Sequence, residues 1–545
     1  MSDRKQSWLA AGALLLLVLC LYAPSLENGF VDWDDGSLIE QNPIVHGLTW
    51  EHIKSSFSTY DPELYTPLTF LSYQLTYAIA DLQPFAYHLG NVMLHALNAI
   101  LILWMVYVLR RKKFEAFVCG LLFAVHPLNT EAVAWASARK DVLAAFFFLS
   151  SIVAYLYRGE GKKYYFLSIL FFLLGLLSKV SILMLPLSLV LIDRLQGRHF
   201  DRKQLMEKAP YMFLSIVFGI VAVFGKFANT SFYWEKFLLG CKAIVFYLGK
   251  LFLPGHFSLL YPYTQTISLA STDILLSVLA VIALCVTSIL VRKRYPLVFF
   301  CWWWYVILLL PTFTTIAKGH DAALDVYFAS DRYAYVPSIG ILILIATVVD
   351  VLYRKFQAVA IAFVSFTFLV LIMLTYHQSL VWSDTESLFR SVLASYPNSH
   401  VAHTQLGVVL FNRDEIDGAF AEFQKALAIR PDGTAYYDIG QIYLKKGMID
   451  EAMQAYRSAI VANPVDPDPY INLGALLLQQ GKDKEALAIL EPAKDLKSDS
   501  RLYINLGLAY EHLGRKKDAI DAYKRALELD PENEEIRQSL SELSQ

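Results

Sequence analysis

The chain has 545 residues, of which 56% are apolar and only 18% charged, with a mean hydropathy of +0.43. Soluble globular proteins carry about 25% charged residues, so this composition excludes an ordinary soluble enzyme, a disordered protein and a disulfide scaffold. The net charge of −2 conceals a split, because residues 380–545 hold 18 basic and 26 acidic residues while the preceding part is net basic. We therefore predict two domains, residues 1–379 and residues 380–545.

Residues 1–379 contain repeated apolar runs that approach or reach the length of a transmembrane helix. The first run follows a basic start and precedes no small-residue cleavage site, so we predict that it stays as an uncleaved span. We predict an all-α bundle of about eleven spans, near residues 8–24, 86–109, 114–128, 142–157, 164–178, 180–193, 209–226, 271–291, 296–315, 336–353 and 357–379.

Basic residues between the predicted spans indicate the topology, since Lys and Arg concentrate in cytosolic loops. All basic clusters fall on the cytosolic side only if residues 236–254 form an amphipathic helix in the outer interface. This arrangement predicts a cytosolic N-terminus and an extracytoplasmic C-terminus. The loops 27–83, 126–141, 255–270 and 316–335 then share the non-cytosolic face, where we expect the active site.

A period of about 34 residues begins after residue 400 and predicts a helical repeat array. Gly recurs at 407, 440, 474 and 507, an Ala follows each Gly by 12 residues, and a second Ala follows by 7 more. This is the tetratricopeptide pattern, in which small residues let paired helices approach closely. We predict an α-solenoid of about four repeats, preceded by a half-repeat at residues 382–397. Such arrays present a concave face to peptides or partner proteins.

The strongest chemical candidate is the pair Asp34 and Asp35, which follows the first span at the predicted outer membrane surface. Adjacent carboxylates there could bind a cation, or one of them could act as a general base. The alternative is a solvated turn with a helix cap, and the pair alone does not decide between these interpretations.

A polar stripe, His88, Asn91, His95 and Asn98, lies on one face of the second predicted span. Polar side chains inside a membrane face the bundle interior. They contribute either to a substrate site or to hydrogen bonds between helices, and the second interpretation is favoured.

The loop after the third span contains His126, Glu131, Arg139 and Lys140. His126 and Glu131 are suited to hold a metal ion or position an acceptor, and Arg139 or Lys140 to bind an anionic headgroup. Interfacial anchoring explains these residues equally well.

The last external loop ends with Arg332 and Tyr333. The guanidinium fork of Arg332 is suited to a phosphate, and Tyr333 also fits an aromatic belt. Lys179 is a weaker phosphate candidate, and residues 229–231 form an isolated glycosylation sequon. The sequence contains no phosphate-binding loop or dinucleotide fingerprint, so a membrane-borne donor is favoured over a nucleotide sugar.

Together these motifs resemble the transmembrane and tetratricopeptide-repeat (TMTC) proteins, which belong with the GT-C glycosyltransferases. The resemblance covers nearly the whole chain and departs from the family pattern at Thr66, where Arg is frequent, and at Asn129, where a second His is common. The matching elements are Asp34-Asp35 with Ile39 and Asn42, Tyr65–Thr69, His88–Asn98, His126–Val133 with Arg139 and Asp141, and Arg332–Ser338.

This resemblance implies an inverting transfer of a sugar from a polyprenyl-phosphate donor to an acceptor hydroxyl at the non-cytosolic face. In this reading Asp34 is the base, and Asp35 supports it or holds a cation. Arg332, then Arg139 or Lys140, binds the lipid phosphate. The residues His126, Glu131, Tyr333, His88 and His95 shape the substrate side. The resemblance leaves open whether the reaction needs a divalent cation, and Asp35, His126 and Glu131 are its candidate ligands.

The implied partners are a lipid-linked donor, membrane lipids and a protein acceptor recruited by the repeats, with no nucleic acid. The expected product is an O-glycosylated protein, and O-mannosylation is one form of it. A bacterial inner membrane is favoured over the endoplasmic reticulum, because the repeats contain no Cys.

Two other functions remain open. A membrane-anchored repeat protein could serve as a scaffold without catalysis, but an anchor needs only one or two spans. A transporter of lipid-linked sugars would need a polar path across the bilayer, whereas the charged motifs gather at one face.

Overall fold

The computed structural model describes residues 3–60, 64–198, 201–224, 233–314, 326–496 and 499–544. These residues form helices and no strand, apart from one antiparallel bridge between Pro262 and Tyr327. The prediction of an all-α fold is therefore confirmed. The chain divides into two compact units, Met1–Ser391 and Val392–Gln545, which are described separately.

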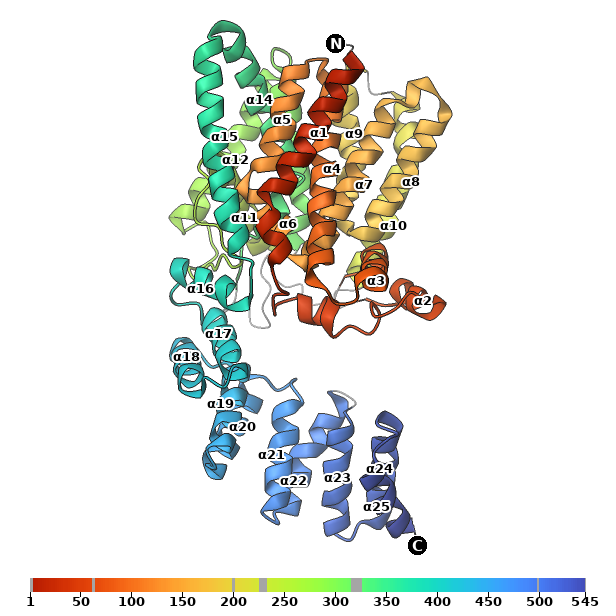
Figure 1. Ribbon diagram of the computed structural model, residues 1–545, viewed down its shortest axis with the longest axis vertical. Coiled ribbons are helices and arrows are strands. Elements are labelled where there is room, and N and C mark those ends of the chain that lie inside the picture. The colour runs from red at the N-terminus through yellow and green to blue at the C-terminus, as the bar shows by residue number, and fades with distance from the viewer. Residues whose placement is uncertain are drawn as a thin grey trace. The chain divides into compact units, whose positions relative to one another are not determined.

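Every segment predicted as a span contains a helix of the first unit (Figure 1). These helices are α1 (Asp3–Leu21), α4 (Pro84–Arg110), α5 (Lys113–Val125), α7 (Arg139–Leu156), α8 (Lys162–Ser178), α9 (Leu185–Leu195), α10 (Arg202–Phe224), α12 (Thr272–Val291), α13 (Pro296–Leu309), α14 (Ser338–Lys355) and α15 (Gln357–Leu380). Among the described residues, five are long and apolar enough to cross a membrane, namely α4, α10, α12, α13 with its extension to Phe313, and α15. Helix α5 and the segment Pro127–Ala134, bent by 54° from it, would together make a sixth.

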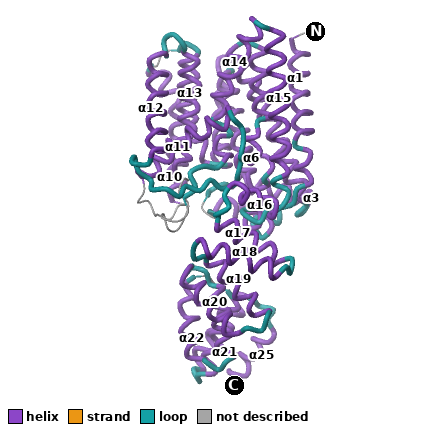
Figure 2. The backbone as a smooth tube through the Cα atoms, turned by 90° about the vertical axis from the view of Figure 1, so that its left-hand side faces the viewer, coloured by secondary structure: helices purple, strands orange, loops and turns teal. Residues whose placement is uncertain are grey.

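Helix α4 lies at the centre of this unit, where it contacts α1, α5 and α7. Helix α7 packs on α8, and α14 packs on α5, α13 and α15. In Figure 1 the α4–α5 and α14–α15 connections lie at the same end as the start of α1. Figure 2 shows loops gathered at the opposite end, near α6. The loops that carry the predicted motifs therefore meet at one end of the bundle.

Shorter elements build this loop-rich end. They are η1 (Ala23–Glu27), η2 (Gly36–Glu40), α2 (Trp50–Ser58), α3 (Pro67–Ala80), η3 (Pro127–Asn129), α6 (Thr130–Ala134), η4 (Ala136–Ala138), η6 (Val180–Met184), η7 (Leu310–Thr314) and η8 (Asp331–Ala334). The short helix η5 (Arg158–Glu160) joins α7 to α8. The sequon at 229–231 and much of the predicted loop 316–335 lie outside the described residues.

The helix predicted to lie in the outer interface forms as α11 (Tyr233–Phe252). It packs on α12 and η7, and it buries Leu238, Leu239 and Ile244 against them and their surroundings. The hydroxyl of Tyr305 on α13 donates a hydrogen bond to the Ile244 carbonyl at 2.6 Å. Helix α11 is therefore an integral part of the packed unit.

The second unit consists of paired helices followed by a last helix. They are α17 (His400–Asn412), α18 (Ile416–Ile429), α19 (Gly433–Lys445), α20 (Ile449–Ala462), α21 (Asp468–Gln479), α22 (Asp483–Leu490), α23 (Ser500–His512), α24 (Lys516–Leu529) and α25 (Glu534–Ser544), with η9 (Glu491–Asp495) after α22. Helix α16 (Thr385–Ser395) occupies the predicted half-repeat and crosses the boundary between the units.

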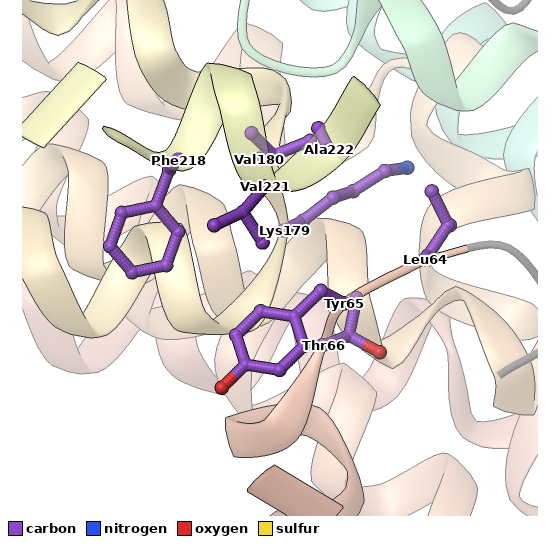
Figure 3. A pocket seen from close by; sticks show the side chains of 8 residues that line it. All are labelled: Leu64, Tyr65, Thr66, Lys179, Val180, Phe218, Val221 and Ala222. Carbon is purple, nitrogen blue, oxygen red and sulfur yellow. The ribbon is translucent and has the colours of Figure 1, made fainter. Parts of the chain in front are cut away.

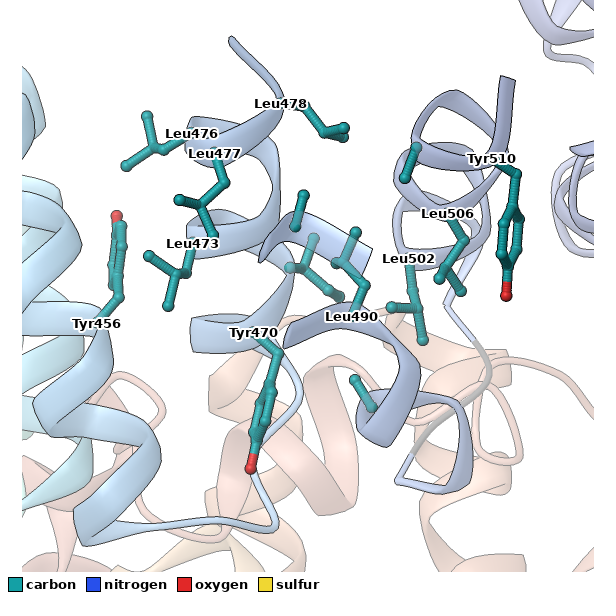
Figure 4. Close-up of a cluster of buried hydrophobic side chains, with 14 of the residues drawn as sticks. Tyr456, Tyr470, Leu473, Leu476, Leu477, Leu478, Leu490, Leu502, Leu506 and Tyr510 are labelled. Carbon is teal, nitrogen blue, oxygen red and sulfur yellow. The ribbon is translucent and has the colours of Figure 1, made fainter. Parts of the chain in front are cut away.

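The period of small residues is explained by packing inside each helix pair. The periodic glycines face a large side chain sixteen residues later, and a Cβ on Gly440 would lie 2.6 Å from Tyr456 Cε1. The alanines that follow, such as Ala452 and Ala459, are fully buried. Figure 4 shows leucine and tyrosine side chains of α21, α22 and α23 meeting in one continuous core, including Leu473, Leu490 and Leu506.

Candidate active site

The two adjacent carboxylates differ in their surroundings. Asp35 is fully buried. Its Oδ2 accepts a hydrogen bond from the Val31 N–H at 2.9 Å, and its Oδ1 accepts from the Ser137 N–H at 2.8 Å and from the Ser137 hydroxyl. Burial raises the pKa of Asp35 to about 6, and the hydrogen bonds from Ser137 and Val31 oppose part of that rise. Asp35 therefore ties the first loop to η4.

The Asp34 carboxylate faces the other way, and its side chain is 36% exposed. Its Oδ2 lies 3.7 Å from the Nζ of Lys140, in the first turn of α7. The Lys140 side chain is 9% exposed, so the ammonium of this nearly buried lysine is directed toward the one accessible carboxylate of the pair.

Ion pairs of the next residue, Asp141, extend this cluster to other segments. Asp141 Oδ1 lies 2.5 Å from the Nζ of Lys179, in the turn after α8. Asp141 Oδ2 lies 4.0 Å from the Nε of Arg332 in η8. Arg332 Nη1 pairs with Glu131 of α6, and the Ser330 hydroxyl donates to the same carboxylate at 2.6 Å.

Two buried polar atoms of this ion-pair cluster lack a hydrogen-bond partner in the described structure. They are Arg332 Nε and Asp141 Oδ2, the two atoms 4.0 Å apart. The Arg332 guanidinium also lies over the Trp135 ring, 5.0 Å from its centroid. A buried donor without an acceptor is costly, so this N–H is suited to an incoming anionic oxygen.

Two small adjoining pockets open beside this cluster. Both are lined by Leu64 and Thr66, and the smaller one also by Ser137 and Lys140. In Figure 3 the larger pocket lies between Tyr65, the Lys179 stem and the end of α10. Its walls from α10 are Phe218, Val221 and Ala222.

Arg139, a predicted phosphate ligand, is bound by groups of the protein itself. Its Nε donates to Asn91 Oδ1 at 2.5 Å, its Nη2 to the Tyr87 carbonyl at 2.7 Å, and its Nη1 to Thr76 at 3.3 Å. The structure therefore places Arg139 between α4 and α3, away from the Lys140 ammonium that follows it in sequence.

The predicted histidines also bind main-chain groups. His88 Nε2 lies 3.3 Å from the Gly29 carbonyl. His95 joins the Ala124 carbonyl at 3.2 Å and the Tyr335 hydroxyl at 2.7 Å. His126 joins the Leu251 carbonyl at 3.2 Å and the Leu128 N–H at 3.2 Å. These contacts hold helices and loops together, as the interhelical interpretation of the stripe expects.

The candidate metal ligands do not converge. The Asp35 carboxylate is occupied by Ser137 and Val31, both ring nitrogens of His126 bind the backbone, and Glu131 binds Arg332. Among the described residues no group of three or more His, Cys, Asp or Glu side chains is placed to hold a metal ion. We therefore assign no step of the chemistry to a metal.

Sequence reasoning placed Tyr333 near the site but missed the groups that hold its segment. The Lys179 ammonium and the Arg332 guanidinium both lie over the Tyr333 ring, at 5.8 and 5.1 Å from its centroid. The Tyr247 hydroxyl donates to the Ser330 carbonyl at 2.9 Å, and the Tyr261 hydroxyl contacts both Asp331 carboxylate oxygens at 2.9 Å. Tyr247 and Tyr261 carry no motif signal in the sequence, so only the folded chain reveals them.

Comparison with known proteins supports both parts of this description. Tetratricopeptide repeat models match residues 440–481 and 500–533, so the second unit contains tetratricopeptide repeats. A solved tetratricopeptide protein, YrrB, aligns with 28% of this chain and 81% of its own, with 24% identity and a TM-score of 0.27.

Curated relatives extend the similarity to the membrane unit. Human protein O-mannosyl-transferase TMTC3 is 24% identical over 96% of this chain and 64% of its own length. Human protein O-mannosyl-transferase TMTC2 is 36% identical over 27% of this chain and 18% of its own. The chain thus spans a little under two thirds of the TMTC3 relative. Over nearly its whole length it is similar to TMTC protein O-mannosyl-transferases, as its motifs indicate.

Proposed function

We propose that this protein is a membrane glycosyltransferase that moves a sugar from a polyprenyl-phosphate donor to a hydroxyl group of a protein. The observation that carries the proposal is the convergence of Asp34, Lys140, Lys179 and Arg332 at one end of the bundle. These residues come from four separate segments. Lys140 lines one of two adjoining pockets, and Lys179 lines the other, which also borders the apolar helix α10.

Asp34 is the base in this proposal, because it is the exposed carboxylate of the pair. Its carboxylate takes the proton from the acceptor hydroxyl, whose oxygen then attacks the anomeric carbon of the sugar. Asp35 is a positioning residue. Its three hydrogen bonds join its side chain to the Val31 N–H, which precedes Asp34, and to Ser137 in the η4 turn.

The leaving group is the lipid phosphate. As the bond from the acceptor oxygen to the anomeric carbon forms, the bond from that carbon to the phosphate oxygen breaks, and the phosphate keeps the electron pair. Cations placed beforehand stabilise this developing charge. Lys140, Lys179 and Arg332 supply them, and Arg332 Nε offers a buried N–H without an acceptor in the described structure.

We infer that a lipid-linked donor approaches the site along the pocket that Lys179 borders. One wall is the end of α10, a helix long and apolar enough to cross a membrane. Phe213, Ile216 and Ile220 of that helix are exposed on the unit's surface, as lipid-facing residues are. An isoprenoid chain can follow this face while its phosphate lies beside the Lys179 ammonium.

The path of the chain at the end of the first unit also supports a protein acceptor. The segment that leaves α15 runs beside the Asp34 loop: the Gly29 N–H donates to the Ser383 carbonyl at 2.9 Å, and the Asp32 N–H to the Thr385 hydroxyl at 2.9 Å. The chain therefore leaves the first unit at the end that carries the site. We place the site and the repeats together on the non-cytosolic side.

The test is transfer of labelled mannose, and of other hexoses, from polyprenyl-phosphate donors to envelope proteins by the purified chain. Asp34→Asn should lower the rate by about 10²- to 10⁴-fold, the usual effect of losing a general base. Asp32→Asn removes the same charge from an exposed residue of the same loop and should retain activity.

The outcome also decides between an enzyme and a scaffold. Transfer by the wild type and by Asp32→Asn, with loss in Asp34→Asn, supports the proposal. Absence of transfer from every donor, while the repeats still bind protein, would instead favour a membrane-anchored scaffold.

A further inference from the structure

The first helix of each repeat carries a polar residue two positions before the periodic glycine. These residues are Gln405, Asp438, Asn472 and Asn505, and we call them the polar ladder. Helix α17 contacts α19, and α21 contacts α23. Between α19 and α21 the Asn472 side chain reaches Tyr437, the residue before Asp438. The ladder therefore places one polar side chain at the same position in each repeat.

The amide N–H groups of the ladder are used inside the protein. Asn472 Nδ2 donates to the Tyr437 hydroxyl at 3.2 Å and to the Tyr456 hydroxyl at 3.5 Å. Asn505 Nδ2 donates to the Ile471 carbonyl at 3.2 Å. In the described structure the amide oxygens of Asn472 and Asn505 receive no hydrogen bond. Asn472 and Asn505 can therefore offer a ligand hydrogen-bond acceptors, their amide oxygens, rather than donors.

Asp438 is the unusual member, because the residue is only 7% exposed and its carboxylate is weakly partnered. Its hydrogen bond within the described residues comes from Gln441 Nε2 at 3.5 Å, the far limit of hydrogen-bond length. Burial, together with the nearby carboxylates of Asp432 and Asp466, raises the pKa of Asp438 to about 7. A buried carboxylate in these surroundings is costly until a cationic donor reaches it.

We propose that Asp438, Asn472 and Asn505 bind an extended, basic segment of a protein. A Lys or Arg side chain of the segment pairs with Asp438, and its main-chain N–H groups donate to the Asn472 and Asn505 oxygens. The negative charge of residues 380–545 complements such a partner. The proposal deepens the proposed function, since it names the chemistry of the acceptor region that the repeats recruit.

The spacing of the ladder suits extended chain. Packed helices lie about 8–10 Å apart, and a strand advances about 3.3 Å per residue. One repeat therefore matches roughly three residues of an extended peptide. A peptide with Lys at every third position can place one Lys at Asp438 in any of several registers.

The experiment measures binding of a fluorescein-labelled (Lys-Thr-Thr)₄ peptide to the full chain in detergent by fluorescence anisotropy. We expect this peptide to bind and the matched (Glu-Thr-Thr)₄ peptide not to bind. Asp438→Asn should weaken binding about tenfold, the loss expected for a hydrogen bond to a charged group. Asn505→Ala, which leaves every charge in place, should weaken it several-fold.

Asp417→Asn is the matched control. It removes the same charge from α18, where the Asp417 side chain is 97% exposed, and should leave the affinity unchanged. Equal affinities of the Asp438→Asn and Asp417→Asn variants, or equal binding of the Lys and Glu peptides, would overturn the proposal. Far-ultraviolet circular dichroism confirms that each variant remains folded.

Binding and catalysis are separable in this design. The Asp34→Asn variant should lose transfer and keep its affinity for the Lys peptide. If transfer is established but the peptide does not bind, the ladder proposal fails alone. If the peptide binds as expected but no donor supports transfer, the ladder proposal stands and the transferase proposal fails.

Discussion

Two adjacent aspartates are chemically equivalent in the sequence, and folding makes them different. Asp35 turns inward to three hydrogen-bond donors, whereas Asp34 turns toward Lys140 and solvent. The raised pKa belongs to the buried residue, because burial penalises the charged form of a carboxyl group. The accessible carboxylate is the one that can meet an acceptor hydroxyl.

The raised pKa of Asp35 predicts how the stability of the membrane unit depends on pH. Its pKa rises from about 4 in the unfolded chain to about 6 in the folded one, so the folded state holds the proton more tightly. Stability is therefore lost as pH rises from 4 to 6, by about 3 kcal/mol at most. Asp35→Asn lacks this titration.

The measurement is the melting temperature followed by tryptophan fluorescence, since all ten Trp residues lie before residue 392. Between pH 4 and 6.5 the melting temperature of the wild type should fall relative to that of Asp35→Asn. A constant difference across this range would show that Asp35 titrates in the folded protein as it does in the unfolded chain.

For single residues, the sequence predicts which side chains share a helix face better than it predicts what each side chain contacts. The spacing of His88, Asn91 and His95 correctly predicted one face of a helix, because helix periodicity is local. It could not show that Arg139 binds Asn91 while Lys179 approaches Asp141, since both contacts join segments distant in sequence. The contacts place Lys179, rather than Arg139, beside Asp141.

Helices and repeats were more predictable than side-chain partners. The Gly and Ala period alone gave the tetratricopeptide array, because close helix packing allows only small residues at those positions. Apolar runs likewise gave the helices of the membrane unit. Whether a shorter helix such as α9 crosses a bilayer depends on packing and tilt rather than on composition alone, so the number of spans stays a prediction.

The close approach of paired helices predicts a specific cost for a methyl group. In Gly440→Ala the new Cβ would lie 2.6 Å from Tyr456 Cε1, so the buried Tyr456 ring must move. Overpacking of this kind costs about 1–3 kcal/mol. The helical circular dichroism of the second unit should therefore melt at a lower temperature, with the tryptophan transition of the first unit unchanged.

Gly418→Ala provides the matched comparison in a neighbouring helix of the same repeat array. A Cβ there would meet only Leu410 Cδ1, at an ordinary 3.4 Å. Because Ala is favoured over Gly in a helix, this change should stabilise the unit by up to about 1 kcal/mol. If the two substitutions had the same effect, steric contact at Gly440 would not explain the regular spacing of the small residues in the repeats.

At the scale of the whole molecule, charge is distributed between the two ends of the membrane unit. Arg110 and Lys112 meet Glu115, and Lys112 and Arg354 meet Asp350, so the α4–α5 and α14–α15 connections share one basic end. The loop with Asp34 lies at the other end (Figure 1). Because basic connections favour the cytosol, this arrangement supports a non-cytosolic site.

This topology can be tested with single added cysteines and a membrane-impermeant maleimide in intact bacterial cells. Lys446→Cys lies on the repeat unit and Arg354→Cys in the last turn of α14, and both native side chains are well exposed. We expect labelling of Lys446→Cys in intact cells, and of Arg354→Cys only in inverted vesicles. The wild type, with its five native cysteines in or beside apolar helices, measures the background.

The opposite pattern would have a chemical consequence. If the maleimide reached Arg354→Cys from outside, the Asp34 cluster would face the cytosol, where water-soluble nucleotide sugars are the common donors. The described residues and the sequence offer no nucleotide-binding motif for such a donor. Labelling of the repeat unit from outside would instead place Asp34, Lys179 and the polar ladder on the face where a lipid-linked donor meets an exported protein.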